Sequence, residues 1–227
     1  MKRRNEKYWI VNKLDAITAE ILIYGDIYRY DGCVNASDFV KELKGLEKSC
    51  SKINVRINSN GGDVFEGIAI FNAIKNSPCD IDIYIDGMAA SMGSVIAMAG
   101  RKVYMSRFAR LMTHKPSGGA WGNADDLRRA ADEIDDCEKI LSDIYVSKTG
   151  MTSQKVSDDL LNGKDVYFNA DQALKAGLID GIYDGAKVEV PETMTDFKEI
   201  WSMYRAQLHI EDTEEVFTEN STTIILS

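Results

Sequence analysis

A serine lies between small residues at a predicted strand-to-helix junction. The stretch 87–94 (GMAASMGS) follows an alternating apolar and polar strand pattern at 81–85 and leads into an apolar helix start at 95–99. Small neighbours leave the Ser91 hydroxyl uncovered, and a helix N-terminus offers free backbone N–H groups to developing negative charge. The stretch therefore predicts a nucleophilic serine, although a tightly packed turn without chemistry would have the same composition.

A histidine follows at a suitable place. A serine hydroxyl becomes a good nucleophile when a base accepts its proton, and histidine is the usual base near neutral pH. Of the two histidines, His209 is far from the predicted sheet along the chain, whereas His114 directly follows a predicted strand at 110–113. Catalytic groups collect at the carboxyl ends of strands in open α/β sheets. His114 is therefore the candidate base, with a purely structural histidine as the alternative.

The base needs a carboxylate that fixes its tautomer and stabilises the imidazolium. The chain has 36 acidic residues, so composition does not select one. Asp165 is favoured because it lies outside any helical pattern and directly precedes an apolar run. Spacing alone leaves Asp63, Asp86 and Asp180 open.

A glycine turn supplies a second candidate element. The segment 58–62 (NSNGG) follows a predicted strand at 53–57, and paired glycines let the backbone present N–H groups to a bound oxygen. The N–H groups of Gly61 and Met92 would form an oxyanion hole, in which the loss of one donor costs about 3–4 kcal/mol in barrier. An ordinary helix-entry turn is the alternative. The GxGxxG spacing of a dinucleotide site is absent.

The composition excludes several classes of function. A net charge of -9 and a pI of about 4.8 argue against a nucleic-acid or anionic-membrane surface. No run approaches the roughly 20 apolar residues of a membrane span, and residues 1–8 lack the apolar core of an export signal. Cys33, Cys50, Cys79 and Cys137 show no metal-ligand spacing. We therefore expect a soluble cytoplasmic protein with reduced thiols and with neither metal nor cofactor.

Alternating strand and helix patterns predict an α/β fold with parallel strand pairs. Strands are expected at 20–24, 53–57, 81–85, 102–105 and 110–113. Helices are expected at 37–46 with Ser37 or Asp38 as the cap, and at 63–75, 90–99, 153–161 and 170–176.

A longer helix is predicted over 123–149, where apolar residues recur at helical spacing and Gly150 follows. About 25 residues would extend about 37 Å at roughly 1.5 Å per residue, which exceeds what one small sheet needs. We expect this helix to project and to pack against another subunit, with a long surface helix as the plainer alternative. An apolar stripe at 191–209 and an acidic segment complete the chain. The predicted organisation is an N-terminal segment 1–17, a core domain 18–187 and a C-terminal appendage 188–227.

Four motifs in this order resemble the ClpP-like serine peptidases, and especially the ClpP-related head maturation (prohead) proteases of tailed phages and prophages. They are the turn 58–62, the segment 87–93 around Ser91, the segment 112–116 (MTHKP), and the segment 163–180 that contains Asp165. The resemblance covers about residues 18–185. It implies the ClpP/crotonase ββα superhelix, with residues 123–149 as its long projecting handle helix.

The resemblance implies a role for each matching residue. Ser91 would be the nucleophile, His114 the general base and Asp165 the orienting carboxylate, with Gly61 and Met92 as the oxyanion-hole amides. Further residues would fall in the substrate-binding segment, namely Gly62, Gly118 and Gly119.

The resemblance also implies partners. The family forms homo-oligomeric rings, which the handle helix would stack into a double ring, and it acts on polypeptides. For the prohead proteases the substrate is capsid or scaffold protein, and the site of action is the bacterial host cytoplasm or the phage prohead. Two features depart from the family pattern. Asn60 replaces the usual proline of the glycine turn, and residues 1–13 do not match the axial loops that engage an unfoldase ATPase. The resemblance therefore leaves the use of an ATPase partner open.

The leading hypothesis is a serine endopeptidase that acts through an acyl-enzyme. Three alternatives stay open. The chain could be a catalytically inactive, ring-forming structural paralogue. It could be a crotonase-type enzyme that binds an acyl-CoA thioester in the same oxyanion hole. It could also use a Ser/Lys dyad with Lys115 or another lysine as the base, which the presence of His114 disfavours.

Overall fold

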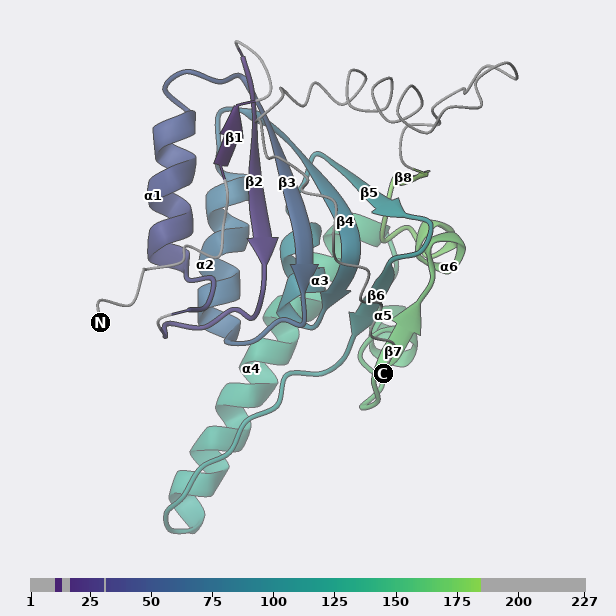
Figure 1. Ribbon diagram of the computed structural model, residues 1–227. Helices are drawn as coiled ribbons and strands as arrows, with labels where there is room; N and C mark the ends of the chain where they lie inside the picture. Colours follow the sequence, from purple (N-terminus) through teal and green to yellow (C-terminus); the bar gives the residue numbers. More distant parts are fainter. Residues whose placement is uncertain (1–10, 14–16, 31, 185–227) are drawn as a thin grey trace, which may run out of the picture. The chain divides into compact units, whose positions relative to one another are not determined.

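The structure, a computed structural model, describes residues 11–13, 17–30 and 32–184 (Figure 1). Its described part contains one sheet of eight strands. The strands are β1 (Val11–Lys13), β2 (Thr18–Tyr24), β3 (Lys52–Ser59), β4 (Asp80–Ala90), β5 (Lys102–Ser106), β6 (Arg110–Thr113), β7 (Val166–Phe168) and β8 (Gly181–Tyr183).

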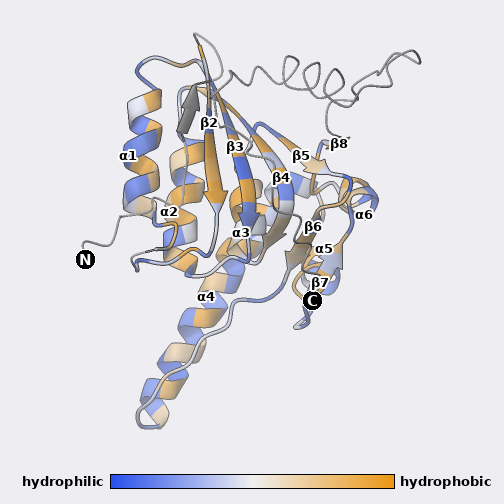
Figure 2. Cartoon of the chain, viewed as in Figure 1, coloured by the Kyte–Doolittle hydropathy of each residue, from blue (hydrophilic) through white to orange (hydrophobic). Residues whose placement is uncertain are grey.

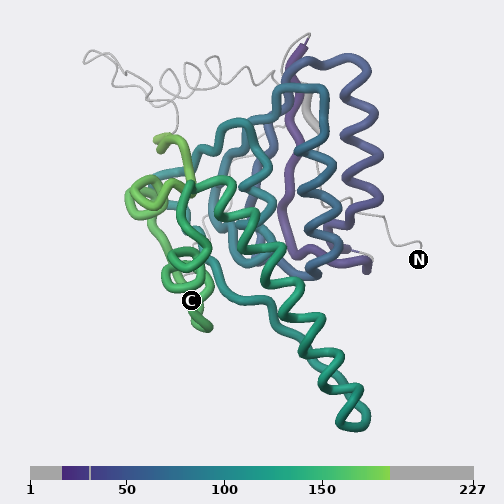
Figure 3. Tube along the Cα trace, turned by 180° about the vertical axis from the view of Figure 1, so that it is seen from behind, coloured from purple at the N-terminus to yellow at the C-terminus, as the bar shows by residue number. Residues whose placement is uncertain are grey.

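Six helices accompany the sheet within the described ranges. They are α1 (Ala36–Leu46), α2 (Val64–Lys75), α3 (Met92–Ala97), α4 (Ala124–Thr149), α5 (Ser153–Asp159) and α6 (Ala170–Lys175). Helix α2 and the end of α4 nearest the sheet lie behind the strands in Figure 1 and in front of them in the reversed view of Figure 3, so they share one face. Helix α1 lies beside α2 in both views.

The strand order is β1-β2-β3-β4-β5-β8, and β6 pairs with both β4 and β7. The pairs among β2, β3, β4 and β5 are parallel, as are β4 with β6 and β5 with β8. Antiparallel pairing is confined to β1 with β2 and β6 with β7. The predicted α/β fold with parallel strand pairs is confirmed.

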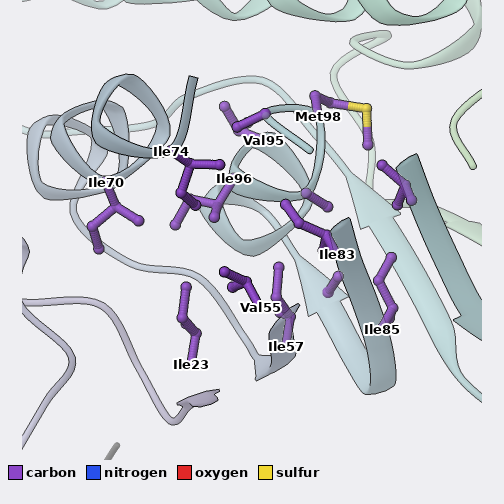
Figure 4. Close-up of a cluster of buried hydrophobic side chains, with 14 of the residues drawn as sticks. Ile23, Val55, Ile57, Ile70, Ile74, Ile83, Ile85, Val95, Ile96 and Met98 are labelled. Atoms are coloured by element: carbon purple, nitrogen blue, oxygen red, sulfur yellow. The ribbon is translucent and has the colours of Figure 1, made fainter. Parts of the chain in front are cut away.

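The core lies between the sheet and its helices. Alternate residues of β3 and β4, such as Val55, Ile57 and Ile83, are fully buried. They meet apolar side chains of α2 and α3, among them Ile70 and Ile96 (Figure 4). The hydropathy colouring shows the same arrangement of buried and exposed surfaces. The apolar side of α1 turns toward the sheet, and its polar side turns away from it (Figure 2). Burial of these side chains at about 25 cal/mol per Å² of apolar surface is the main stabilising contribution.

Strand β4 changes its neighbour midway along its length. Ile85 pairs with Met105 of β5, whereas the residues from Met88 to Ala90 pair with β6. Against β3 the register jumps, so that one residue of β3 faces three of β4. The side chain of Asn58 fills this irregularity, because its Oδ1 accepts the Met88 N–H at 3.1 Å. The change of partner carries the end of β4 onto β6.

Several predicted boundaries shift. Helix α1 begins at Ala36 because Asn35, rather than Ser37 or Asp38, caps it by accepting the Asp38 N–H. Helix α3 begins at Met92 rather than at residue 90, because Ala90 still pairs in β4. Helix α4 has 26 residues, Ala124–Thr149, close to the predicted range 123–149. Gly150 follows it as the C-cap, with a left-handed φ of 71°.

Some predictions lie outside the described residues. The appendage 188–227 belongs there, as does most of the segment 1–17, so the predicted domain limits stay predictions. Within the described ranges, no helix has both the length and the apolar character needed to cross a membrane.

Candidate active site

Ser91 has an unusual backbone conformation. It precedes the first residue of α3 with φ 52° and ψ −122°, and it is the one non-glycine residue of the described part with a positive φ. Such a conformation costs on the order of 1–3 kcal/mol and persists where the surroundings impose it. Here the Ser91 N–H donates to the Met112 carbonyl at 2.9 Å, which ties the end of β4 to β6.

The structure brings Ser91, His114 and Asp165 together. His114 follows β6 and Asp165 precedes β7, and the antiparallel pair of Thr113 with Val166 places them side by side. His114 Nε2 lies 2.8 Å from Ser91 Oγ, and Nδ1 lies 3.1 Å from Asp165 Oδ1. An ionised carboxylate can only accept, so the Nδ1 proton is directed to Asp165. The Nε2 lone pair is then free to accept the serine proton.

The three other carboxylates that spacing left open have different partners. Asp63 caps α2 by accepting the Glu66 N–H at 2.9 Å. Asp86 accepts hydrogen bonds from Arg56, Tyr24 and Tyr183 on the sheet.

Asp180 binds two lysines, Lys102 and Lys148, and the backbone N–H of Val103. Burial raises the pKa of Asp180, but these three hydrogen bonds outweigh that effect and hold its pKa below the ordinary value. Of the four candidates, Asp165 is the one that lies beside the imidazole.

The glycine turn gives its two amides different directions. The Gly61 N–H donates to Ser59 Oγ at 3.1 Å, so it already has a partner. The Gly61 carbonyl accepts from Ile27, and the Asp63 N–H donates back to Ile27, both at 2.8 Å. In this pairing the N–H of Gly62 points away from Ile27. Gly62 also lines the cavity that contains Ser91 and His114. The geometry thus favours Gly62 over the predicted Gly61 as the amide that faces the site.

Gly61 is needed for its lack of a side chain rather than for its amide. Its φ is +92°, and a Cβ at this position would lie 2.6 Å from the Ala90 carbonyl oxygen and 2.8 Å from the Met92 nitrogen. Only glycine allows the turn to approach the end of β4 this closely. Two adjacent glycines look equivalent in a sequence, and their roles separate only when the pairing with Ile27 is known.

The Met92 amide is the second predicted donor. The first amides of a helix have no intrahelical acceptor. In α3 the first bonds to the Ser91 carbonyl come from Ser94 and Val95, at 2.9 and 3.3 Å. The Met92 N–H, one residue after the serine, is therefore not used by the helix.

A cavity of about 570 Å³ opens beside Ser91. Its walls come from the loop at Tyr28, the glycine turn, the segment after β6 and one face of α4. That segment includes Gly118 and Gly119, which were expected near the substrate. The α4 wall is formed by Ala130, Glu133, Ile134 and Cys137. Burial, with the nearby carboxylate of Glu133, raises the pKa of the Cys137 thiol, so the thiol stays protonated.

In the described ranges, no three His, Cys, Asp or Glu side chains are grouped so that they could hold a metal ion.

Comparison with known proteins gives consistent matches. A family model described as Clp protease matches residues 3–186. The ATP-dependent Clp protease proteolytic subunit 2 of Chlamydia trachomatis is 37% identical over 143 residues, which cover 62% of this chain and 70% of that protein. The proteolytic subunit 1 of Corynebacterium jeikeium is 35% identical over 147 residues, which cover 64% and 77%.

Among solved structures, a variant of ClpP1 from Listeria monocytogenes superposes with a TM-score of 0.65 at 26% identity. The match covers 74% of this chain and 92% of that chain.

Proposed function

Because the chain belongs to the Clp protease family, we propose that it is a serine endopeptidase with Ser91 as nucleophile, His114 as general base and Asp165 as the orienting carboxylate. The observation that supports these roles most directly is the hydrogen-bonded series Ser91–His114–Asp165, with distances of 2.8 and 3.1 Å. A base must lie within hydrogen-bond reach of the proton it removes, and His114 meets that condition for the Ser91 hydroxyl.

The first half of the reaction forms an acyl-enzyme. Ser91 Oγ attacks the carbonyl carbon of the scissile peptide, and its proton moves to His114 Nε2. The carbonyl oxygen becomes negatively charged and is stabilised by the N–H groups of Gly62 and Met92. When the C–N bond breaks, the imidazolium gives its proton to the leaving amine. Asp165 stabilises the imidazolium between these two transfers.

The second half releases the acyl group. A water molecule gives a proton to His114 Nε2 and attacks the ester carbonyl, and the same two amides hold the oxyanion. Collapse of the intermediate breaks the bond to Ser91 Oγ, which recovers its proton from the imidazolium. The products are a new carboxyl terminus and the free serine. The net reaction consumes one peptide bond and one water molecule.

The nucleophile is tested by replacing Ser91 with alanine. The Ser91→Ala variant should lose labelling by a fluorophosphonate and lose peptide cleavage, by a factor on the order of 10⁶ where it is measurable. Ser153→Ala is the matched control, since Ser153 is an exposed residue of α5. Unchanged labelling of Ser91→Ala would contradict the assignment. A folded, assembled parent protein that neither labels nor cleaves would favour the inactive structural paralogue.

We further propose that the chain assembles into a homo-oligomeric ring, with α4 packing between rings, and that it cleaves capsid or scaffold protein in the bacterial host cytoplasm or the prohead. The phage role rests on the resemblance of the sequence motifs. Co-expression with a candidate capsid protein, followed by mass spectrometry of the cut sites, tests it. Cuts that appear with the parent and vanish with Ser91→Ala would support the proposal, and an intact capsid protein would contradict it.

The curated relatives are named ATP-dependent proteases. For this chain we propose cleavage without an ATPase partner, because residues 1–13 lack the axial-loop pattern. Of this segment the structure describes only residues 11–13. Cleavage of an unfolded polypeptide by the purified chain in the absence of ATP would support this proposal.

A further inference from the structure

A buried chain of hydrogen bonds connects α4 with the backbone of the nucleophile. The Ser94 hydroxyl lies 2.6 Å from the Ser91 carbonyl oxygen and 2.7 Å from the Tyr145 hydroxyl. Ser94 is 0% exposed and Tyr145 is 1% exposed. Ser94 belongs to α3 and Tyr145 to the C-terminal half of α4. Their contact therefore joins two helices at a point beside the site.

The direction of these bonds follows from proton counting. A serine hydroxyl has one proton, and a backbone carbonyl can only accept. Ser94 therefore donates to the Ser91 carbonyl, and Tyr145 donates to Ser94. Burial raises the pKa of Tyr145, so its hydroxyl stays protonated and remains a donor. Both buried hydroxyls are satisfied in this arrangement, which avoids the cost of leaving a buried polar group without a partner.

The Ser91 carbonyl belongs to the same peptide unit as the Met92 N–H. A peptide unit is planar, and in the trans form its carbonyl and its N–H point in opposite directions. No cis peptide occurs in the described part of the chain. The Ser91 carbonyl accepts the N–H groups of Ser94 and Val95, at 2.9 and 3.3 Å, and the Ser94 hydroxyl makes a third and shorter bond at 2.6 Å. These three bonds together hold the carbonyl toward α3 and so fix the opposite direction of the Met92 N–H. The hydroxyl is the one among them that connects the carbonyl with Tyr145 of α4. The ψ angle of Ser91, −122°, sets the orientation of this plane.

We propose that Tyr145 and Ser94 are positioning residues for the oxyanion hole, since they hold the Ser91–Met92 peptide plane that aims the Met92 amide. The proposal rests on the proposed peptidase function. It gives α4 a second connection to the site besides the cavity wall at Ile134 and Cys137. The position of α4 is thereby coupled to the geometry in which the oxyanion is stabilised.

The Tyr145→Phe variant tests this inference, because it removes the hydroxyl and keeps the buried ring. Loss of an oxyanion donor lowers the rate about 10²–10³-fold, so a misdirected donor should lower kcat for a fluorogenic peptide by about tenfold or more. KM should change by less than about twofold, because substrate binding in the ground state does not use the oxyanion hole. The affinity of a peptide boronate, which forms a tetrahedral adduct with the serine, should fall by the same factor as kcat/KM.

Tyr24→Phe is the matched control. It also removes a tyrosine hydroxyl that donates to a partly buried acceptor, Asp86, outside the site. Tyr24→Phe should keep the parent values of kcat, KM and boronate affinity. Circular dichroism and the thermal midpoint of each variant, with assays run well below that midpoint, separate a folding defect from a kinetic one.

A double-mutant cycle adds a second measurement. If both hydroxyls act through one peptide plane, Ser94→Ala combined with Tyr145→Phe should be no slower than Ser94→Ala alone. Two results would overturn the inference: parental kcat and boronate affinity in Tyr145→Phe, or additive effects in the double variant. Both comparisons require a parent protein that labels at Ser91. If the proposed peptidase function is wrong, the parent protein itself will not label or cleave. If only the positioning role is wrong, the parent will be active and Tyr145→Phe will match it.

Discussion

At the scale of single residues, the imidazole of His114 has a partner on each ring nitrogen. Lys115, the next residue, points elsewhere, because its Nζ pairs with Glu138 of α4 at 2.8 Å. The histidine thus contacts Ser91 and the lysine contacts Glu138, which favours a Ser/His arrangement over a dyad of Ser91 and Lys115.

We predict that His114→Ala loses at least about 10²-fold in kcat, since general-base catalysis contributes about 10²–10⁴-fold. Lys115→Ala, measured with the same fluorogenic peptide, should retain most of the parent activity. A large loss in Lys115→Ala together with an active His114→Ala would instead identify the lysine as the base.

A second residue-scale prediction concerns Gly61. Gly61→Ala would place a methyl group against the Ala90 carbonyl and the Met92 nitrogen, in a backbone with φ +92°. We expect a loss of at least about 2 kcal/mol in the free energy of unfolding, from overpacking combined with backbone strain. Fluorophosphonate labelling of the folded protein should also slow.

The control is Gly150→Ala, because Gly150 also has a positive φ, +71°, but nothing lies within 4 Å of its added Cβ. Gly150→Ala should cost about 1 kcal/mol in urea unfolding and leave labelling unchanged. Equal effects of the two variants would contradict the steric argument for Gly61.

The sequence predicted the three side chains of the candidate site but not the groups that orient its backbone amides. Small neighbours indicated Ser91, and a position after a strand indicated His114. Asp165 was favoured because it precedes an apolar run, and the resemblance to the ClpP-like peptidases selected it over the other aspartates. The structure places the three side chains in contact. The choice between Gly61 and Gly62 was not predictable, because it depends on a pairing with Ile27 that is remote in sequence. The same holds for Tyr145, which reads as one more apolar position in a long helix.

At the scale of elements, the change of partner in β4 places the segment that ends at Ser91 beside β6, which precedes His114. Asp86 lies at this irregularity and joins three other strands, through Tyr24 of β2, Arg56 of β3 and Tyr183 of β8. The spacing of apolar residues predicted the longer strands and helices well, because it depends only on the residues within each segment. It did not identify β7 or β8, which have three residues each and form only through pairing with β6 and β5.

The Asp86 contacts predict a pH dependence of stability. Burial, followed by the hydrogen bond to Asp86, raises the pKa of Tyr24 from 10.0 to about 12. The folded state therefore holds this proton more tightly than the unfolded state does. The stabilising contribution is complete below pH 10 and is lost as the pH rises from 10 through about 12.

The measurement is urea unfolding of the parent and of Tyr24→Phe at pH 8, 10 and 12. The difference in free energy of unfolding between the two proteins should shrink across the upper interval. A difference that stays constant from pH 8 to 12 would contradict the assignment of this titration to Tyr24.

At the scale of the whole domain, α4 extends past the sheet (Figures 1 and 3). Its buried residues, Cys137, Leu141 and Tyr145, all belong to the C-terminal half, whereas Leu127 near the N-terminus is 50% exposed. A helix with an uncovered apolar position gains stability when a second molecule covers it.

We predict that Leu127→Glu lowers the assembled mass of the protein, measured by size-exclusion chromatography with light scattering. Leu174→Glu is the matched control, because Leu174 is a similarly exposed leucine (42%) on α6. It should assemble like the parent. A parental mass for Leu127→Glu would contradict the proposed packing of α4 between rings.

The separation of the catalytic residues along the chain also has a consequence during synthesis. Asp165 comes 51 residues after His114, and a ribosome adds about 5–20 residues per second. For roughly 3–10 seconds a nascent chain thus carries the serine and the imidazole without the carboxylate, and β7 has not yet been made to close the edge of the sheet. The hydrogen-bonded series of Ser91, His114 and Asp165 is therefore complete only when translation of the described domain is almost finished.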